Sequence, residues 1–299
     1  MLQKLKQSED VSGREQLPAA QSMLELPARK RWVSNMFHIL MKLLGIYTLI
    51  LLLGTLFLTF QHYVQYAEWQ LPRYPLPLGS PYELGSLLTV VVSAWIVTSL
   101  ERRPFFSLGV NWTRSSLSSF ALGTVLGLFH IFIIATALIV DGRSNVLLNV
   151  NLTSRMLLTS LFTSLLVAVY EELLFRGYIL QILIRGGGVV FGIVTSATLF
   201  SLFHLQAGYY SIPQLLAIGV IGVALAALTI KTRSLWIPIG FHFGWDLAAK
   251  LSPPVEAIGV LYLEPMYFLA FLVLMIVLVL LPLNSDRASR VFWARYVSR

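Results

Sequence analysis

The sequence has no cysteine among its 299 residues, which excludes disulfide bonds and thiolate metal sites. It is also poor in charge, because Asp, Glu, Lys and Arg make up 12% of the chain against about 25% in soluble globular domains. Hydrophobic residues account for 57%, and the mean hydropathy is +0.75. These values exclude a soluble globular domain and indicate a polytopic membrane protein.

Apolar windows of about 20 residues, long enough to cross roughly 30 Å of hydrocarbon, predict an all-α fold with about eight transmembrane helices. Two of these windows, 188–205 and 235–250, are short, as is common for helices buried within protein. The eight windows are 37–60, 84–100, 117–140, 155–183, 188–205, 212–230, 235–250 and 262–283.

The same windows divide the chain into four parts. We expect a polar cytoplasmic tail at 1–34, three N-terminal transmembrane helices within 35–150, a core of five helices within 151–283, and a basic cytoplasmic tail at 284–299. The N-terminal tail lacks the pattern of a removable signal peptide, so the first span should be retained as an anchor.

The distribution of basic residues predicts the orientation. With eight spans, 18 of the 22 lysines and arginines fall on one side of the membrane, which is the cytoplasmic side by the positive-inside rule. Both termini are therefore expected in the cytoplasm. The net charge of +8 reflects these loops, so we expect contact with the lipid bilayer and no nucleic-acid partner. The expected location is the cell membrane, as a multi-pass protein of a bacterial inner membrane.

Ionisable side chains within spans are the candidates for function, because a charge at bilayer depth costs roughly 2.5 to 3.5 kcal/mol by insertion scales. Six of them recur as spaced pairs in three spans: Glu171, Glu172 and Arg176 in the fourth, His204 in the fifth, and His242 and Asp246 in the seventh.

The spacing in the fourth span separates the two glutamates. Residues four apart share one face of a helix, so Glu172 and Arg176 can pair, and the pair can be structural or catalytic. Glu171 is turned about 100° from Glu172. It needs a proton or partners from other helices, and the histidines are the available partners.

In the seventh span, His242 and Asp246 share one face and can form a local hydrogen-bonded pair. The small residues Gly240, Gly244 and Ala248 form a stripe roughly opposite, which suits close packing against a neighbouring helix. At 1.5 Å per residue, Glu171 lies about 22 Å from the predicted cytoplasmic end and His242 about 12 Å. One shared site therefore requires staggered or tilted helices.

Three motifs occur in order: Glu171-Glu172 to Arg176, Phe200 to His204, and His242 to Asp246. Over about residues 155–250, the chain resembles the CAAX prenyl endopeptidase and bacteriocin-processing (CPBP, or Abi) family of intramembrane proteases. The pattern of that family is Glu-Glu-x-x-x-Arg, Phe-x-x-x-His, and His-x-x-x-Asn or Asp.

The resemblance implies an endopeptidase that acts on a membrane-associated protein or peptide. Glu171 would activate water with help from His204, while His242 and Asp246 would stabilise the oxyanion. Glu172 and Arg176 would hold the helix end and orient the base. Many relatives carry Asn where this chain has Asp246. The aspartate can be protonated and donate a hydrogen bond, orient His242 as an anion, or favour a metal.

The resemblance leaves metal dependence open. Glu171, His204, His242 and Asp246 are the residues that could bind a divalent ion such as zinc, although no His-Glu-x-x-His motif occurs. We expect glutamate chemistry without a metal.

Two other functions stay open at this point, a catalytically silent membrane scaffold or regulator and a proton-coupled transporter. The transporter is disfavoured, because the sequence shows no internal repeat and no paired spans broken by glycine or proline.

Overall fold

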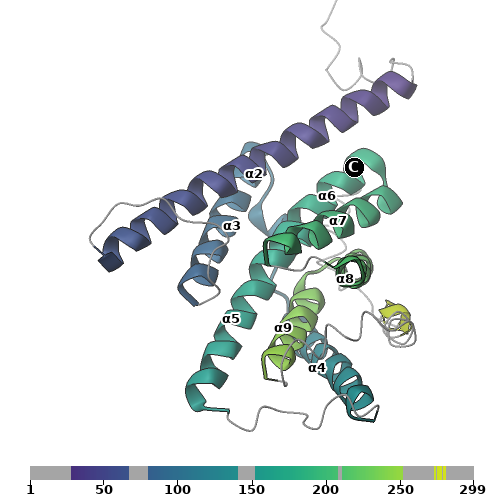
Figure 1. The fold of residues 1–299 in the computed structure, drawn as a ribbon. Helices are drawn as coiled ribbons and strands as arrows, with labels where there is room; N and C mark the ends of the chain where they lie inside the picture. Colours follow the sequence, from purple (N-terminus) through teal and green to yellow (C-terminus); the bar gives the residue numbers. More distant parts are fainter. Residues whose placement is uncertain are drawn as a thin grey trace, which may run out of the picture.

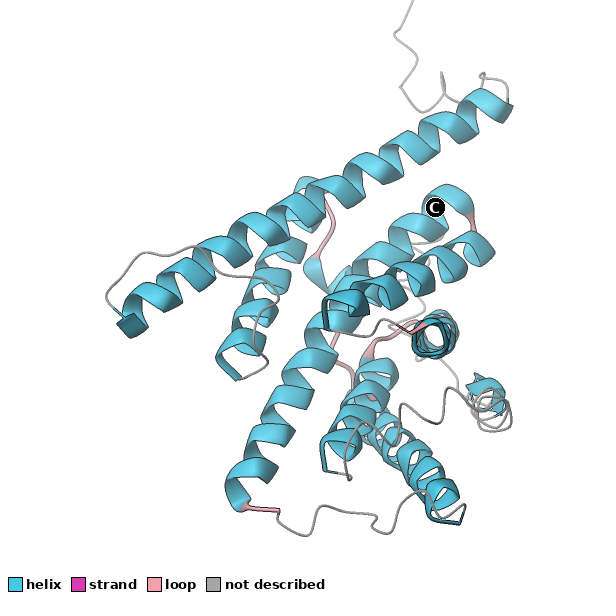
Figure 2. Ribbon diagram, viewed as in Figure 1, coloured by secondary structure: helices cyan, strands magenta, loops and turns pink. Residues whose placement is uncertain are grey.

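A computed structural model of the chain describes residues 28–66, 80–140, 152–207 and 211–251, with positions 273, 275–277, 279 and 280. Every regular element within these ranges is a helix (Figure 2). The predicted all-α class is therefore confirmed. The elements in order are α2 (Ala28–Tyr66), α3 (Ser80–Leu100), η1 (Phe105–Leu108), α4 (Ser116–Val140), α5 (Ser154–Glu172), η2 (Leu173–Ile179), α6 (Leu180–Gly187), α7 (Val189–Phe203), η3 (His204–Ala207), α8 (Ile212–Thr232) and α9 (Trp236–Leu251).

The first seven predicted spans each coincide with a helix of the structure. Among the described residues, five helices are long and apolar enough to cross a membrane, and α5, η2 and α6 form one of them, Ser154–Gly187. The predicted short spans correspond to α7 and α9. Most of the eighth window, residues 1–27 and the predicted C-terminal tail lie outside the described residues, so the orientation of the termini stays a prediction. Residues 28–34, which were expected in the polar tail, form the start of α2.

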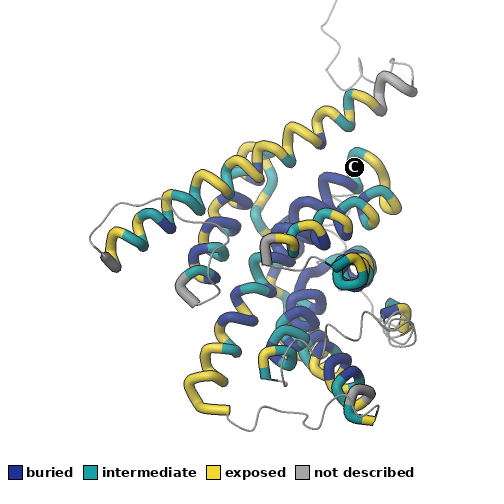
Figure 3. The backbone as a smooth tube through the Cα atoms, in the orientation of Figure 1, coloured by how far each residue is buried: buried dark blue, intermediate teal, exposed yellow. Residues whose placement is uncertain are grey.

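Burial is concentrated around η2, α6 and the first half of α9, whereas α2 exposes much of its surface (Figure 3). All seven residues of η2 are buried. The exposed side chains of α2 include Phe37, Leu52 and Phe60, which suit contact with lipid. The most buried segment of the fold therefore follows Glu171 and Glu172 directly.

Helices α4 and α9 pack along each other at very short range (Figure 1). A Cβ atom added at Gly240 would meet the carbonyl oxygen of Phe120, and one added at Gly244 would meet that of Thr124. The predicted small-residue stripe on α9 is thus confirmed as a contact surface, and its partner is α4. Because this face lies against α4, the opposite face of α9 carries His242 and Asp246 toward α5.

Helix α9 begins deep within the bundle, which reconciles the unequal depths predicted for Glu171 and His242. The amide of Leu235 donates to the carbonyl of Gly109, next to η1 (2.9 Å). A Cβ atom added at Gly177 would lie 3.2 Å from the carbonyl oxygen of Leu108 and 3.3 Å from the Leu235 side chain. The start of α9 is therefore level with Gly177, well up the fourth span. His242 lies about 10 Å further along α9, at the level of the glutamates.

Candidate active site

The centre of the site is a buried ion pair at the end of α5. Glu171 is 6% exposed, and Glu172 and Arg176 are fully buried. Nη1 of Arg176 donates to Oε1 of Glu172 at 2.8 Å, as their spacing of four residues predicts. Such a pair neutralises two charges that would each be costly in the interior.

Arg176 connects this pair to two further helices. Its Nη2 donates to the carbonyl of Gly222 on α8 (3.5 Å), and its Cζ atom lies 4.0 Å from the centroid of the Phe200 ring on α7. The phenylalanine of the second motif therefore makes a cation-π contact with the arginine of the first.

His242 lies between the two glutamates. Its Nδ1 is 2.9 Å from Oε1 of Glu172, and its Nε2 is 3.8 Å from Oε2 of Glu171. Since Glu172 Oε1 also accepts from Arg176, it carries no proton, so Nδ1 of His242 is the donor. The sequence predicted the pair of Glu172 with Arg176, and the structure adds that Glu172 also fixes the ring of His242.

Asp246 lies on the same side of His242 as Glu171. Its Oδ1 is 3.8 Å from Nε2 of His242, and its side chain is 23% exposed. Nε2 thus faces two carboxyl groups, one buried and one partly accessible. This arrangement favours a ring protonated on both nitrogens, which can donate a hydrogen bond from Nε2.

His204 belongs to the same neighbourhood through Phe200 and Glu171. Its Nδ1 donates to the carbonyl of Phe200 (2.9 Å), so in the neutral ring Nε2 carries the lone pair. The Phe200 ring packs edge-on against the rings of His204 (4.8 Å between centroids) and His242 (6.1 Å). Glu171 interacts electrostatically with both histidines. The six predicted residues therefore gather in one region.

Sequence reasoning missed two residues near the site, Tyr170 and Glu83. Tyr170 interacts electrostatically with Glu171, Asp246 and Glu83. Glu83 lies on α3 and is 7% exposed. It comes one residue before the predicted span at 84–100, so it was not counted among the charges within spans. A carboxylate in the first turn of an apolar helix is the signal that could have found it.

The helix changes its winding immediately after the glutamates. Residues Leu173–Ile179 are π-helical, and Ser196 of α7 donates to the carbonyl of Phe175 inside this segment (3.2 Å). Local π-helical turns are rare and frequently occur at functional sites. The spacing of Glu172 and Arg176 in the sequence does not reveal the π-helix, because their contact is possible in an α-helix and in a π-helix.

The residues proposed as metal ligands do not form a complete set in the described part of the chain. There, no group of three or more His, Asp or Glu side chains has an arrangement that would hold a metal ion. Nδ1 of His242 and Nδ1 of His204 are both committed to protein oxygen atoms, which leaves Nε2 of each ring as the nitrogen that could bind a metal ion. Metal dependence therefore stays a question for experiment, and the mechanism proposed for these residues uses no metal ion.

Comparison with known protein families gives one match. Residues 153–248 match the family described as type II CAAX prenyl endopeptidase Rce1-like. The matched segment runs from the N-cap of α5 to two residues past Asp246, so it includes all three motifs. Comparisons with curated proteins and with solved structures found no match. The segment that builds this site is thus similar to the Rce1-like type II CAAX prenyl endopeptidase family, and the five long apolar helices indicate that the chain is a multi-pass membrane protein.

Proposed function

We propose that the chain is an intramembrane endopeptidase that hydrolyses a peptide bond of a membrane-associated substrate with water activated by Glu171. The observation that carries this proposal is the division between the two glutamates. Glu172 is held through Oε1 by Arg176 and His242, although its Oε2 has no hydrogen-bond partner among the described residues. The buried Oε2 of Glu171 also accepts no hydrogen bond from the described residues, and it lies 3.8 Å from Nε2 of His242. A buried acceptor without a donor is costly and indicates a functional group.

In the proposed reaction, the oxygen of water attacks the carbonyl carbon of the peptide bond as the Glu171 carboxylate takes a proton from the water. The carbonyl π electrons move onto oxygen and give a tetrahedral oxyanion. As the C–N bond breaks, Glu171 returns the proton to the leaving nitrogen. His204, with Nδ1 held by Phe200, presents Nε2 as an acceptor that orients the water.

His242 is the proposed donor to the oxyanion. Glu172 holds its Nδ1 and thereby sets the direction of Nε2, in the way that carboxylates orient histidines in other enzymes. Asp246, 3.8 Å from Nε2, stabilises the protonated ring. Of the three roles open for Asp246, the geometry supports the one in which it acts as an anion on His242. A donor aimed in advance at the developing charge is worth about 3 to 4 kcal/mol.

The test compares cells that express the wild type with cells that express Glu171→Gln. New N-termini of membrane proteins are identified by mass spectrometry. We expect a set of fragments that depends on Glu171, while the variant keeps its abundance and its melting temperature in detergent. Identical fragments in both cells would overturn the proposal and favour the scaffold. A solute flux that is lost in Glu171→Gln and on collapse of the proton gradient would favour the transporter.

A further inference from the structure

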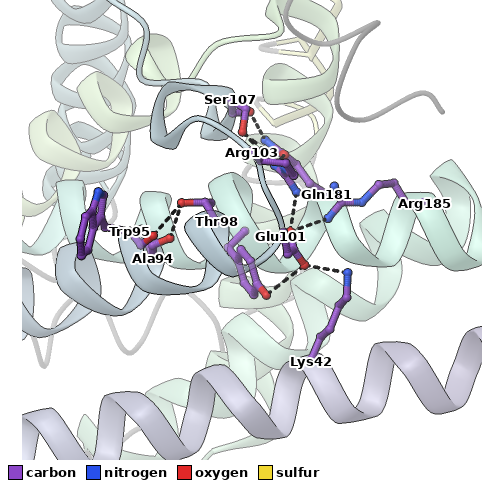
Figure 4. Close-up of polar contacts among 10 residues, drawn as sticks. Lys42, Ala94, Trp95, Thr98, Glu101, Arg103, Ser107, Gln181 and Arg185 are labelled. Atoms are coloured by element: carbon purple, nitrogen blue, oxygen red, sulfur yellow. Dashed lines mark hydrogen bonds and ion pairs between the residues drawn. The ribbon is translucent and has the colours of Figure 1, made fainter.

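A second group of charged side chains lies away from the site, where α3 ends (Figure 4). Glu101 follows α3 directly, and its Oε1 is 2.7 Å from Nζ of Lys42 on α2. Its Oε2 is 3.1 Å from Nη1 of Arg103 and 3.7 Å from Nη2 of Arg185 on α6. We name these four residues the Glu101 cluster. Among the described residues, one carboxylate faces three cations, so these four side chains together carry an excess of positive charge.

The cluster lies where two candidate membrane spans end and where α2 passes beside them. The span Tyr82–Leu100 ends immediately before Glu101, and the span Ser154–Gly187 ends two residues after Arg185. Lys42 lies inside a third candidate span, Val33–Val64. The stretch from Lys42 to Val64 measures about 34 Å at 1.5 Å per residue and is long enough to cross the hydrocarbon by itself, which would place Lys42 near the head groups. The positive-inside pattern also assigns Lys42, Arg103 and Arg185 to one side of the membrane, and the structure brings them together.

A polar frame holds Arg103 in place beside Glu101. Its Nη2 donates to Oε1 of Gln181 (2.7 Å), and its Nε and Nη2 donate to Oγ of Ser107 (3.3 and 3.1 Å). Gln181 in turn donates to the carbonyl of Ser107 (3.1 Å). The guanidinium is thus fixed before any ligand arrives, which lowers the entropic cost of binding.

The exposed side of the cluster is formed by the other two cations. The side chain of Lys42 is 43% exposed and that of Arg185 is 18% exposed, against 7% for Arg103. Burial and the positive charge of Arg185 together lower the pKa of Arg103 to about 10, against the opposing effect of Glu101. The cations therefore repel each other, and an anion placed between them would relieve this repulsion.

We propose that the Glu101 cluster is a binding site for a phosphate group between α2, α3 and α6, with Lys42 and Arg185 as its accessible cations. Basic pockets between transmembrane helices at head-group depth are typical sites for anionic lipid head groups. An inorganic phosphate ion offers the same chemistry. The site is separate from the proposed hydrolysis and does not depend on it. Because Lys42 lies on α2, outside the matched segment 153–248, a bound phosphate would help to hold α2 to the core.

The test measures the melting temperature of the full-length protein in nanodiscs of phosphatidylcholine alone and of phosphatidylcholine mixed equally with phosphatidylglycerol. We expect phosphatidylglycerol to stabilise the wild type. The double variant Lys42→Ala/Arg185→Ala should lose most of this shift, with an apparent affinity roughly fivefold weaker for each cation removed. Arg155→Ala, which removes an exposed cation at the start of α5, is the matched control and should keep the shift.

Two further measurements distinguish a lipid phosphate from a free phosphate ion, and both from a purely structural role of the Glu101 cluster. Inorganic phosphate is titrated into phosphatidylcholine nanodiscs at constant ionic strength. A shift that depends on Lys42 and Arg185 there identifies a free-phosphate site, whereas a shift with phosphatidylglycerol alone identifies a lipid site. Glu101→Gln removes the competing carboxylate and should enlarge the shift with the preferred source. Equal shifts in the wild type, the double variant and Arg155→Ala would overturn the proposal.

Discussion

Nδ1 of His242 lies 2.9 Å from Oε1 of Glu172, the same oxygen atom that accepts a hydrogen bond from Arg176. The histidine of the third motif is thus held by the glutamate of the first motif, although 70 positions separate them in the chain. The position of the proposed oxyanion donor consequently depends on a residue that would not itself touch the substrate.

This relationship predicts the effect of Glu172→Gln. The amide keeps the shape of the side chain but weakens the hold on His242, because it carries no charge. We expect kcat to fall about 10-fold to 100-fold with little change in KM, as for other carboxylates that orient an active-site histidine. The measurement is the cleavage rate of a substrate identified with Glu171→Gln. An unchanged kcat would contradict the role of Glu172 as a positioning residue.

Removing the arginine of the buried pair should destabilise the protein. Arg176→Met leaves Glu172 as a buried charge with one partner fewer, which costs about 3 to 5 kcal/mol in the free energy of unfolding. The double variant Arg176→Met/Glu172→Gln removes both charges and should recover much of this loss. Unfolding in detergent measures both variants. A double variant less stable than Arg176→Met would show that charge pairing is not the cause.

The contact between α4 and α9 should be intolerant of larger side chains. Gly244→Leu places a side chain against the carbonyl oxygen of Thr124, so α9 must move away and carry His242 with it. We expect a lower melting temperature and loss of cleavage. Gly45→Leu is the matched control, because Gly45 is exposed and has nothing within 4 Å of an added Cβ atom. Equal effects of the two substitutions would contradict this role of the contact.

The Glu101 cluster predicts a pH dependence of stability. Burial opposes ionisation of Glu101, but the hydrogen bond and charge of Lys42, with the charges of Arg185 and Arg103, outweigh it and lower the pKa of Glu101 below its ordinary value of 4.5. A carboxylate whose pKa is lowered by folding stabilises the protein above its unfolded pKa, and this contribution is lost as the pH falls through the folded pKa. In phosphatidylcholine nanodiscs, the melting temperature of the wild type should therefore exceed that of Glu101→Gln at neutral pH. The difference should shrink below about pH 4.5. A difference that stays constant down to low pH would rule out this linkage.

Metal removal tests the proposed chemistry directly. The steps assigned to Glu171, His204 and His242 use no metal ion, so dialysis against a strong chelator should leave the cleavage rate unchanged. A rate that falls on chelation and returns with zinc would assign a metal to the site and replace the mechanism proposed above. The melting temperature, measured in parallel, separates loss of a catalytic ion from unfolding.

Several features of the site follow from helical periodicity alone. The pairing of Glu172 with Arg176 and the packing stripe at Gly240 and Gly244 depend on residues four positions apart in one helix, where the geometry is set locally. The contact of Phe200 with Arg176 and that of His242 with Glu172 could not be predicted in this way. Each joins two helices, and their relative rotation and depth are set by packing across the bundle.

The sequence by itself determined the membrane class, the all-helical fold, the spans and the residues that carry charge into them, because these depend on composition and on the fixed rise of a helix. The tertiary structure decided which glutamate holds His242 and which stays available. It also decided that Lys42, Glu101, Arg103 and Arg185 form one cluster. The physical reason is the stagger of the helices: the start of α9 is set by the hydrogen bond from Leu235 to Gly109 and by the close contact at Gly177, and both are contacts between segments far apart in the chain.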